Sequence, residues 1–276
     1  MLPLEDTHLD LLAKAQRGMK LSDEALLERA SLSLSELLDI RNGSLDPLLL
    51  EKITSALHLH LPTFSAIAHK TWLPEPIELP HFKTFTTDFD DMTVNAYLVW
   101  DPQSNEAIAF DTGSDVTEML LFATQNQLQI KLILITHTHG DHIFDLDRLM
   151  EKTKAPSYLG DLEPHLKGSE FFTAGKRFQT QSLTIETRLT WGHCQGGITY
   201  LIHGLSRPLA IVGDALFAGS MGGGGVSWEE ALRTNREEIL TLSNETVLAP
   251  GHGPLTTVGE TKRHNPFYSD SIQSLG

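Results

Sequence analysis

A cluster of histidines directly after an apolar strand constrains this chain more than any other feature. Residues Leu132–Ile135 are apolar and predict a buried strand, and Thr136–His142 (THTHGDH) follows them. Because side chains alternate along a strand, the first two histidines can point to the same side. The aspartate and the third histidine lie beyond a glycine and can face a second point nearby. This combination predicts a metal site with room for two ions rather than a histidine-rich surface loop.

Three further ligand candidates follow predicted strands, each beside a glycine. They are His193 after the region 183–191, Asp214 after the strand 209–212, and His252 after the strand 246–249. A single residue of this kind is more often structural. Three in the same local setting, together with the first motif, favour one shared site at one edge of the fold.

From His81 onward, predicted strands and helices alternate, which indicates two sheets with helices on their outer sides. We expect strands at 82–89, 93–100, 106–110, 131–135, 183–189, 198–203, 209–212 and 246–249, and helices at 116–127, 142–150 and 228–242. The expected fold class is therefore α/β, a layered αββα sandwich.

Residues from about Leu9 to Ala68 are predicted to be helical. Helix starts are expected at Ser22-Asp23, Ser33 and Asp46-Pro47. The helix spacing and the Asn42-Gly43 turn resemble the helix-turn-helix domains of the lambda-repressor-like class. The segment in the recognition position, 33–39, carries two acids and no base, whereas phosphate contact needs Lys or Arg. We therefore do not expect DNA binding, and favour a small bundle used for homodimerisation or for covering the larger domain.

Three prolines, Pro74, Pro76 and Pro80, predict an extended linker. The expected domains are a helical domain at 1–70, the linker at 71–80 and a catalytic domain at 81–276.

The formal net charge of −15 disfavours broad binding to nucleic acid or anionic lipid. The chain has no apolar run of membrane-spanning length, and its first residues lack the pattern of a signal peptide. The single cysteine, Cys194, excludes an intramolecular disulfide and is expected to be a small buried residue. These features predict a cytoplasmic protein.

The motifs together resemble the metallo-β-lactamase superfamily, and within it the glyoxalase II-like (hydroxyacylglutathione hydrolase) group. The resemblance runs from about Phe82 to the C-terminus and rests on THTHGDH, GHCQGG, VGDALF and APGHG, with FDTGS upstream and the tail 256–267. It implies that His137, His139 and His193 bind one metal, that Asp141, His142 and His252 bind a second, and that Asp214 bridges them. It also implies that Asp111 supports the site from behind.

This resemblance implies a binuclear hydrolase that acts on a thioester such as S-hydroxyacylglutathione. Two divalent ions about 3.5–4 Å apart lower the pKa of a water to about 7, and the hydroxide attacks a carbonyl. Asp141 and Asp214 are the expected catalytic carboxylates, with Asp141 orienting the hydroxide. Zinc is the favoured metal, and iron or manganese remain alternatives.

The substrate contacts are less constrained. In the family that this chain resembles, a long helical region supplies much of the glutathione contact, and we expect no counterpart of it in the 24 residues after His252. We expect Met221 and Gly222, in the glycine-rich loop 219–225, to lie beside the substrate. This loop lacks the ending of a phosphate-binding loop. Lys262, Arg263 and His264 are candidates for binding an anionic substrate, with a solvated tail as the alternative.

Three other functions remain open. The first is a mononuclear iron persulfide dioxygenase, because that related family keeps the first motif with fewer ligands. The second is a lactonase or another ester hydrolase. The third is a regulator that senses a metal or metabolite.

Overall fold

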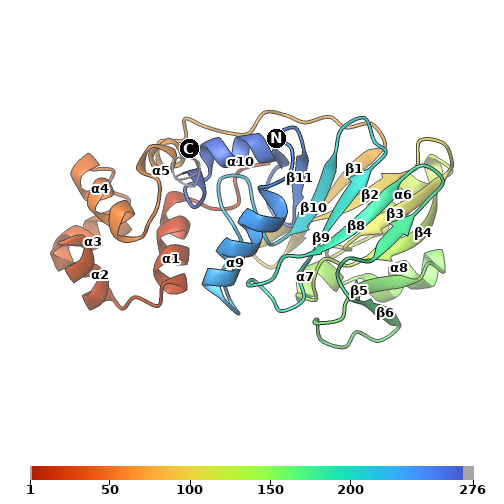
Figure 1. Cartoon of the computed structure of the whole chain (residues 1–276), viewed down its shortest axis with the longest axis horizontal. Coiled ribbons are helices and arrows are strands. Elements are labelled where there is room, and N and C mark those ends of the chain that lie inside the picture. Colours follow the sequence, from red (N-terminus) through yellow and green to blue (C-terminus); the bar gives the residue numbers. More distant parts are fainter. Residues whose placement is uncertain (1, 270–276) are drawn as a thin grey trace.

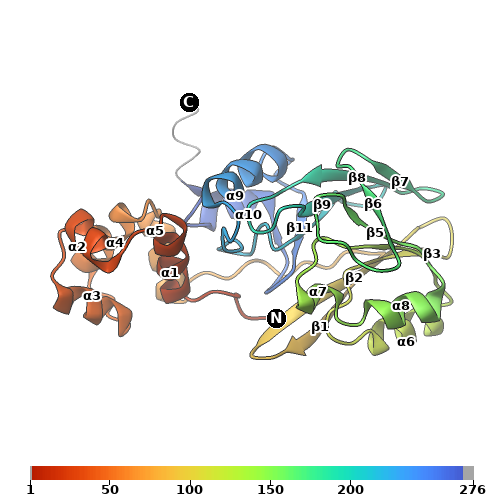
Figure 2. The ribbon, with the colours of Figure 1, turned by 90° about the horizontal axis from the view of Figure 1, so that it is seen from below.

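Two facing sheets, each covered by helices on its outer side, form the larger part of the molecule (Figures 1 and 2). The computed structural model describes residues 2–269. The strands of the first sheet are β1 (Phe82–Phe89), β2 (Met92–Trp100), β3 (Glu106–Phe110), β4 (Gln129–Leu134), β5 (Ser157–Gly160) and β6 (Ser169–Phe172), in that spatial order. The second sheet has the order β12-β11-β10-β9-β8-β7: β7 (Arg177–Gln179), β8 (Thr184–Leu189), β9 (Ile198–His203), β10 (Leu209–Gly213), β11 (Val247–Pro250) and β12 (Thr256–Thr257).

Pairing within the sheets follows the connections between strands. Strands β1 to β3 are antiparallel neighbours, whereas β3 to β6 run parallel. In the second sheet β7 to β10 are antiparallel, and β10 pairs with β11 in parallel. Apolar residues from the facing surfaces, among them Val99, Ile108, Tyr200 and Ile211, form the core between the sheets.

Helices cover both outer faces, which confirms the predicted αββα sandwich. Helices α6 (Thr117–Gln125) and α8 (Leu146–Thr153) pack on the first sheet through Met119 and Leu149. Helices α9 (Trp228–Thr234) and α10 (Val258–His264) pack on the second through Ala231 and Val258.

The N-terminal part of the chain is helical, as predicted. Its helices are α1 (His8–Gly18), α2 (Asp23–Ala30), α3 (Leu34–Arg41), α4 (Pro47–Ala56) and α5 (Leu61–Ala68). The Ser22 side chain accepts a hydrogen bond from the Ala25 amide, and Asp46 accepts one from the Leu48 amide, so these predicted helix starts are confirmed. We call these five helices the helical module.

The helical module packs directly against the sandwich. One continuous core cluster contains Leu11 and Phe64 of the module together with Leu216, Met221 and Tyr268 of the larger part. The His60 amide also donates to the Pro266 carbonyl at 2.9 Å. Residues 71–79, between the two parts, are neither helix nor strand (Figure 1).

Two predicted helices are wrong in extent. The helix expected at 142–150 is divided into α7 (Gly140–Ile143) and α8, because Asp145 turns to accept a hydrogen bond from the Val116 amide at 2.9 Å. The helix expected at 228–242 continues beyond Thr234 as a π-helical turn, η1 (Asn235–Ile239). There the buried Asn235 amide donates to the Ala215 carbonyl at 2.6 Å and to the Tyr268 hydroxyl at 2.8 Å.

The short strands β5, β6, β7 and β12 and helix α10 were not predicted. Each spans only two to seven residues, too few for a periodic apolar pattern to mark it in the sequence. No helix within residues 2–269 combines the length and apolar character needed to cross a bilayer.

Candidate metal centre

The seven predicted ligands come together at one end of the two sheets. His137 and His139 follow β4, and Asp141 and His142 belong to the short helix α7. The second sheet contributes the other three ligands, which are His193 before β9, Asp214 after β10 and His252 after β11. The placement at strand ends beside glycine, inferred from the sequence, is therefore what joins these residues in space.

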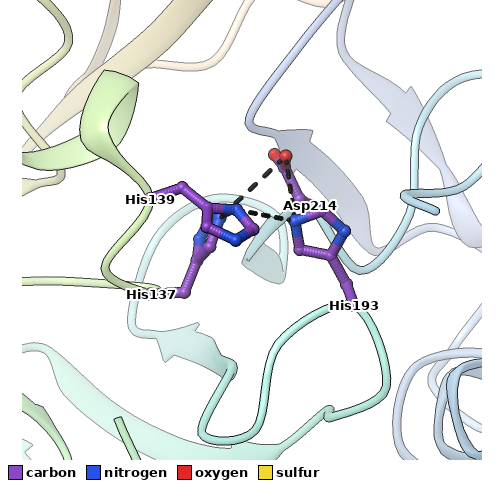
Figure 3. A group of neighbouring side chains, drawn as sticks. All are labelled: His137, His139, His193 and Asp214. Atoms are coloured by element: carbon purple, nitrogen blue, oxygen red, sulfur yellow. Dashed lines mark hydrogen bonds and ion pairs between the residues drawn. The ribbon is translucent and has the colours of Figure 1, made fainter. Parts of the chain in front are cut away.

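The first cluster consists of His137, His139, His193 and Asp214. The Nδ1 atom of His139 lies 3.0 Å from His137 Nε2 and 2.9 Å from His193 Nε2. The Asp214 carboxylate faces the same point, with Oδ2 lying 3.5 Å from His193 Nε2. Figure 3 shows the three imidazole rings converging on one side of this carboxylate.

The second cluster consists of Asp141, His142 and His252. His252 Nε2 lies 3.2 Å from Asp141 Oδ2, and His142 Nε2 lies 3.4 Å from the same oxygen. The two oxygens of Asp214 also reach this cluster, with Oδ1 at 3.3 Å from His142 Nε2 and Oδ2 at 3.3 Å from His252 Nε2. Asp214 therefore lies between the two clusters, in the position of a bridging ligand.

Both clusters fit divalent metal ions. Donor atoms at about 2.0–2.1 Å from a tetrahedral ion stand about 3.3 Å apart, and the separations given above are close to this. His142 Nε2 and Asp214 Oδ1 are buried and, although 3.3 Å apart, neither has a hydrogen-bond partner. Two buried polar atoms aimed at one point without a hydrogen bond are costly unless an ion binds there.

Asp111 lies behind the ligands, where the resemblance places it. Its carboxylate accepts hydrogen bonds from His142 Nδ1 at 2.9 Å and from the Thr136 amide at 2.7 Å. It therefore orients His142 so that Nε2 faces the metal position. Asp111 itself has a φ of 55°, a conformation rare for residues other than glycine. A strained backbone conformation at the end of a strand indicates that Asp111 is held there for a functional reason.

Other supporting groups were not found from the sequence. Glu163 is buried and accepts from the Thr138 amide at 2.8 Å and the Gly196 amide at 2.8 Å, so it joins the loops that hold His139 and His193. Backbone carbonyls orient two further ligands. His193 Nδ1 donates to the Gly223 carbonyl at 2.9 Å, and His252 Nδ1 to the Thr93 carbonyl at 2.6 Å. A single acidic residue and two backbone carbonyls cannot be recognised from the sequence as groups that support a metal site.

The predicted substrate contacts separate into two groups. Gly222 lies against the Asp214 backbone and the His193 ring, and Met221 next to it is fully buried. The glycine-rich loop thus supports the ligands directly. On α10, by contrast, the Lys262 ammonium donates to Asn244 at 2.9 Å, and the His264 ring stacks on Trp72. Arg263 is exposed on the same helix. The described contacts of these residues are thus with other parts of the chain.

The two clusters differ in their protonation. Burial lowers the pKa of His137 and of His193, so both imidazoles are neutral and available to a metal. Burial acts in the same direction on His142 and His252. Their neighbouring carboxylates outweigh it and raise the pKa to about 10 for His142 and about 11 for His252. A metal ion that binds to the second cluster of the metal-free protein must therefore displace protons from these two histidines.

We expect metal binding at the second cluster to weaken as the pH falls. His142 and His252 are protonated at every pH below their raised pKa values, so binding releases up to two protons. Each proton released changes the apparent affinity roughly tenfold per pH unit. Titration of metal into metal-free protein at about pH 6 and about pH 8 measures this, with proton release followed in weak buffer. An affinity for the second equivalent that does not change with pH would contradict the expectation.

Comparison with known proteins agrees with this geometry. The family model described as "Metallo-beta-lactamase superfamily" matches residues 89–252, which is more than half of the chain. The helical module and residues 71–79 lie outside this match. A probable metallo-hydrolase of Streptococcus pyogenes is 29% identical over 201 residues, covering 63% of this chain and 85% of the relative. The hydroxyacylglutathione hydrolase GloC of Haemophilus influenzae is 26% identical over 198 residues, covering 63% and 92%.

Solved structures are similar over the same share of the chain. The B3 metallo-beta-lactamase BLEG-1 has 30% sequence identity and a TM-score of 0.59, covering 67% of this chain and 98% of that one. The protein TTHA1623, solved in a di-iron-bound form, has 26% identity and a TM-score of 0.56, covering 66% and 99%. The His/Asp clusters and this fold together indicate the use of divalent metal.

Proposed function

This chain belongs to the metallo-beta-lactamase superfamily, and we propose that it is a binuclear metallohydrolase whose substrate is a thioester such as S-hydroxyacylglutathione. The observation that carries the proposal is Asp214, whose two oxygens face the histidines of both clusters at 3.3–3.5 Å. The similarity to a protein named hydroxyacylglutathione hydrolase and to one solved with two irons supports it.

Two bound divalent ions would supply a hydroxide at neutral pH and would polarise the carbonyl oxygen of the substrate. The chain's own residues set the conditions for this. Asp214 holds the two sites at a short spacing. Asp141 is a carboxylate at neutral pH, because His252 and His142 lower its pKa against the effect of burial. It can therefore accept a hydrogen bond from the attacking water and orient it.

Two side chains that could act as nucleophiles, Ser220 and Cys194, do not compete with this role. The Ser220 hydroxyl is buried and donates to Asp6, not to a histidine. Cys194 is buried, and burial raises the pKa of its thiol well above the ordinary value, so it is not a thiolate at neutral pH. A thiolate leaving group needs little protonation, which suits a site where no general acid is evident among the described residues.

A substrate panel tests the proposal. The metal-loaded protein should hydrolyse an S-hydroxyacylglutathione thioester, and a chelator should remove the activity until zinc, iron or manganese is restored. A lactone belongs in the panel as the other ester class, and a β-lactam because of the 30% identity to a B3 metallo-beta-lactamase. Oxygen uptake with glutathione persulfide, without thioester hydrolysis, would contradict the proposal and favour a persulfide dioxygenase.

A further inference from the structure

A cavity of about 350 Å³ lies beside the first metal cluster, and the helical module forms part of its wall. On one side are the ligands His139 and His193 and the loop 223–225. On the other side are Lys14, Arg17 and Gly18 of α1. The first helix of the module and the metal centre therefore share one cavity, although they are more than 100 residues apart in sequence.

Helix α1 is held in this position by close contacts. The backbone of Gly18 packs so closely on the indole ring of Trp228 that a Cβ at this position would overlap the ring. The Lys14 ammonium donates to the Met221 carbonyl at 2.9 Å and forms an ion pair with Asp6. Figures 1 and 2 both place α1 next to α9, the helix that begins at Trp228. The α1 wall of the cavity is therefore a fixed part of the fold.

The charge of this wall is opposite to that of the chain as a whole. The net charge of the chain is −15, yet the described residues that line the cavity include two cations and no carboxylate. Lys14 and Arg17 are three positions apart on α1 and so lie on the same face. Lys14 is already engaged, by Asp6 and by the ring of Phe217 at 4.9 Å from its centre. Arg17, by contrast, is exposed and lines the cavity.

We propose that Arg17, with Lys14 beside it, binds an anionic group of the substrate, such as a carboxylate, while the reacting carbonyl lies at the metals. A guanidinium forms paired, charge-assisted hydrogen bonds with a carboxylate, which favours Arg17 as the recognising group. The helical module is then a specificity element of the enzyme. The inference rests on the proposed function for the identity of the substrate, and on the cavity for the anion site.

Binding of a matched pair of small thiols to the full-length, metal-loaded protein tests the anion site without turnover. The probes are 3-mercaptopropionate and its neutral amide, which present the same thiol to the metal and differ in one charge. Calorimetry should show that the acid binds about tenfold more tightly than the amide. Arg17→Gln should abolish this preference and Arg17→Lys should keep part of it. Lys20→Gln, which removes an exposed cation outside the cavity lining, should leave the preference unchanged.

Kinetics separate this inference from the proposed function. With a thioester that carries a carboxylate, Arg17→Gln should raise KM about tenfold with kcat nearly unchanged. With the matching neutral thioester it should change neither. Thioester hydrolysis with no acid preference in either assay would overturn the anion site and leave the proposed function standing. An acid preference that depends on Arg17, without thioester hydrolysis, would overturn the proposed function and leave the anion site standing.

Discussion

Asp214→Asn is expected to abolish turnover while the protein stays folded. The Asp214 carboxylate faces His193 Nε2, His142 Nε2 and His252 Nε2 at 3.3–3.5 Å, so it contributes to both clusters. An amide has the same shape but no charge and only one oxygen, and it cannot bridge two cations in the same way. Loss of several kcal/mol of transition-state stabilisation, at about 1.4 kcal/mol per tenfold, corresponds to a fall in kcat of about a thousandfold or more.

Steady-state kinetics, metal analysis and thermal unfolding measured together check this expectation. Asp147→Asn is the matched control, because Asp147 is exposed on α8, outside both clusters. His139→Ala should also abolish turnover, since it removes a ligand from the first cluster only. If Asp214→Asn or His139→Ala kept near wild-type activity, the binuclear mechanism would be wrong.

Gly251→Ala is expected to reduce turnover strongly although it replaces none of the metal-binding residues. Gly251 lies between Asp214 and His142, and a Cβ there would stand 2.6 Å from His142 Cε1 and would overlap Asp214 Oδ1. Its amide donates to the Gly213 carbonyl at 2.9 Å, so the backbone cannot easily move away. The methyl group would push the two ligands apart, and we expect the second metal to be lost and kcat to fall at least about a hundredfold.

Gly140→Ala is the matched control for this substitution. Gly140 lies inside the THTHGDH motif, between two ligands, yet a Cβ there meets only Phe89 at 3.7 Å, an ordinary contact. Metal content and activity should therefore remain close to wild type. Equal losses of activity in Gly251→Ala and Gly140→Ala would show that the methyl group at position 251 does not act by crowding the ligands.

The candidate ligands could be predicted because all are metal-binding residue types that follow predicted strands, and five of them stand next to a glycine: His139, Asp141, His193, Asp214 and His252. Local sequence carries all of that information, and the same apolar periodicity predicts the longer strands and the sandwich. The supporting acid Glu163 had no such signal, since it acts only when the chain brings the Thr138 and Gly196 amides to it. The breaks at Asp145 and Asn235 also come from distant partners, which override the local preference for helix.

The placement of the helical module was also beyond the sequence. The helix spacing and the acidic segment 33–39 predict a small bundle for homodimerisation or for covering the larger domain. The contact that joins it to the metal centre, from Lys14 to the Met221 carbonyl, spans 207 positions. The helical periodicity of residues 8–18 does not reveal that one face of α1 lines a cavity beside His139 and His193. This position is what would allow Arg17 to act as the proposed anion site.

The dependence of thioester hydrolysis on metal added to the metal-free protein tests the central claim most directly. We predict that the rate rises until two equivalents of metal are bound per chain and then stays constant, with both equivalents counted by elemental analysis. A rate that is already maximal at one equivalent per chain, or hydrolysis that persists in metal-free protein, would contradict a binuclear hydrolase.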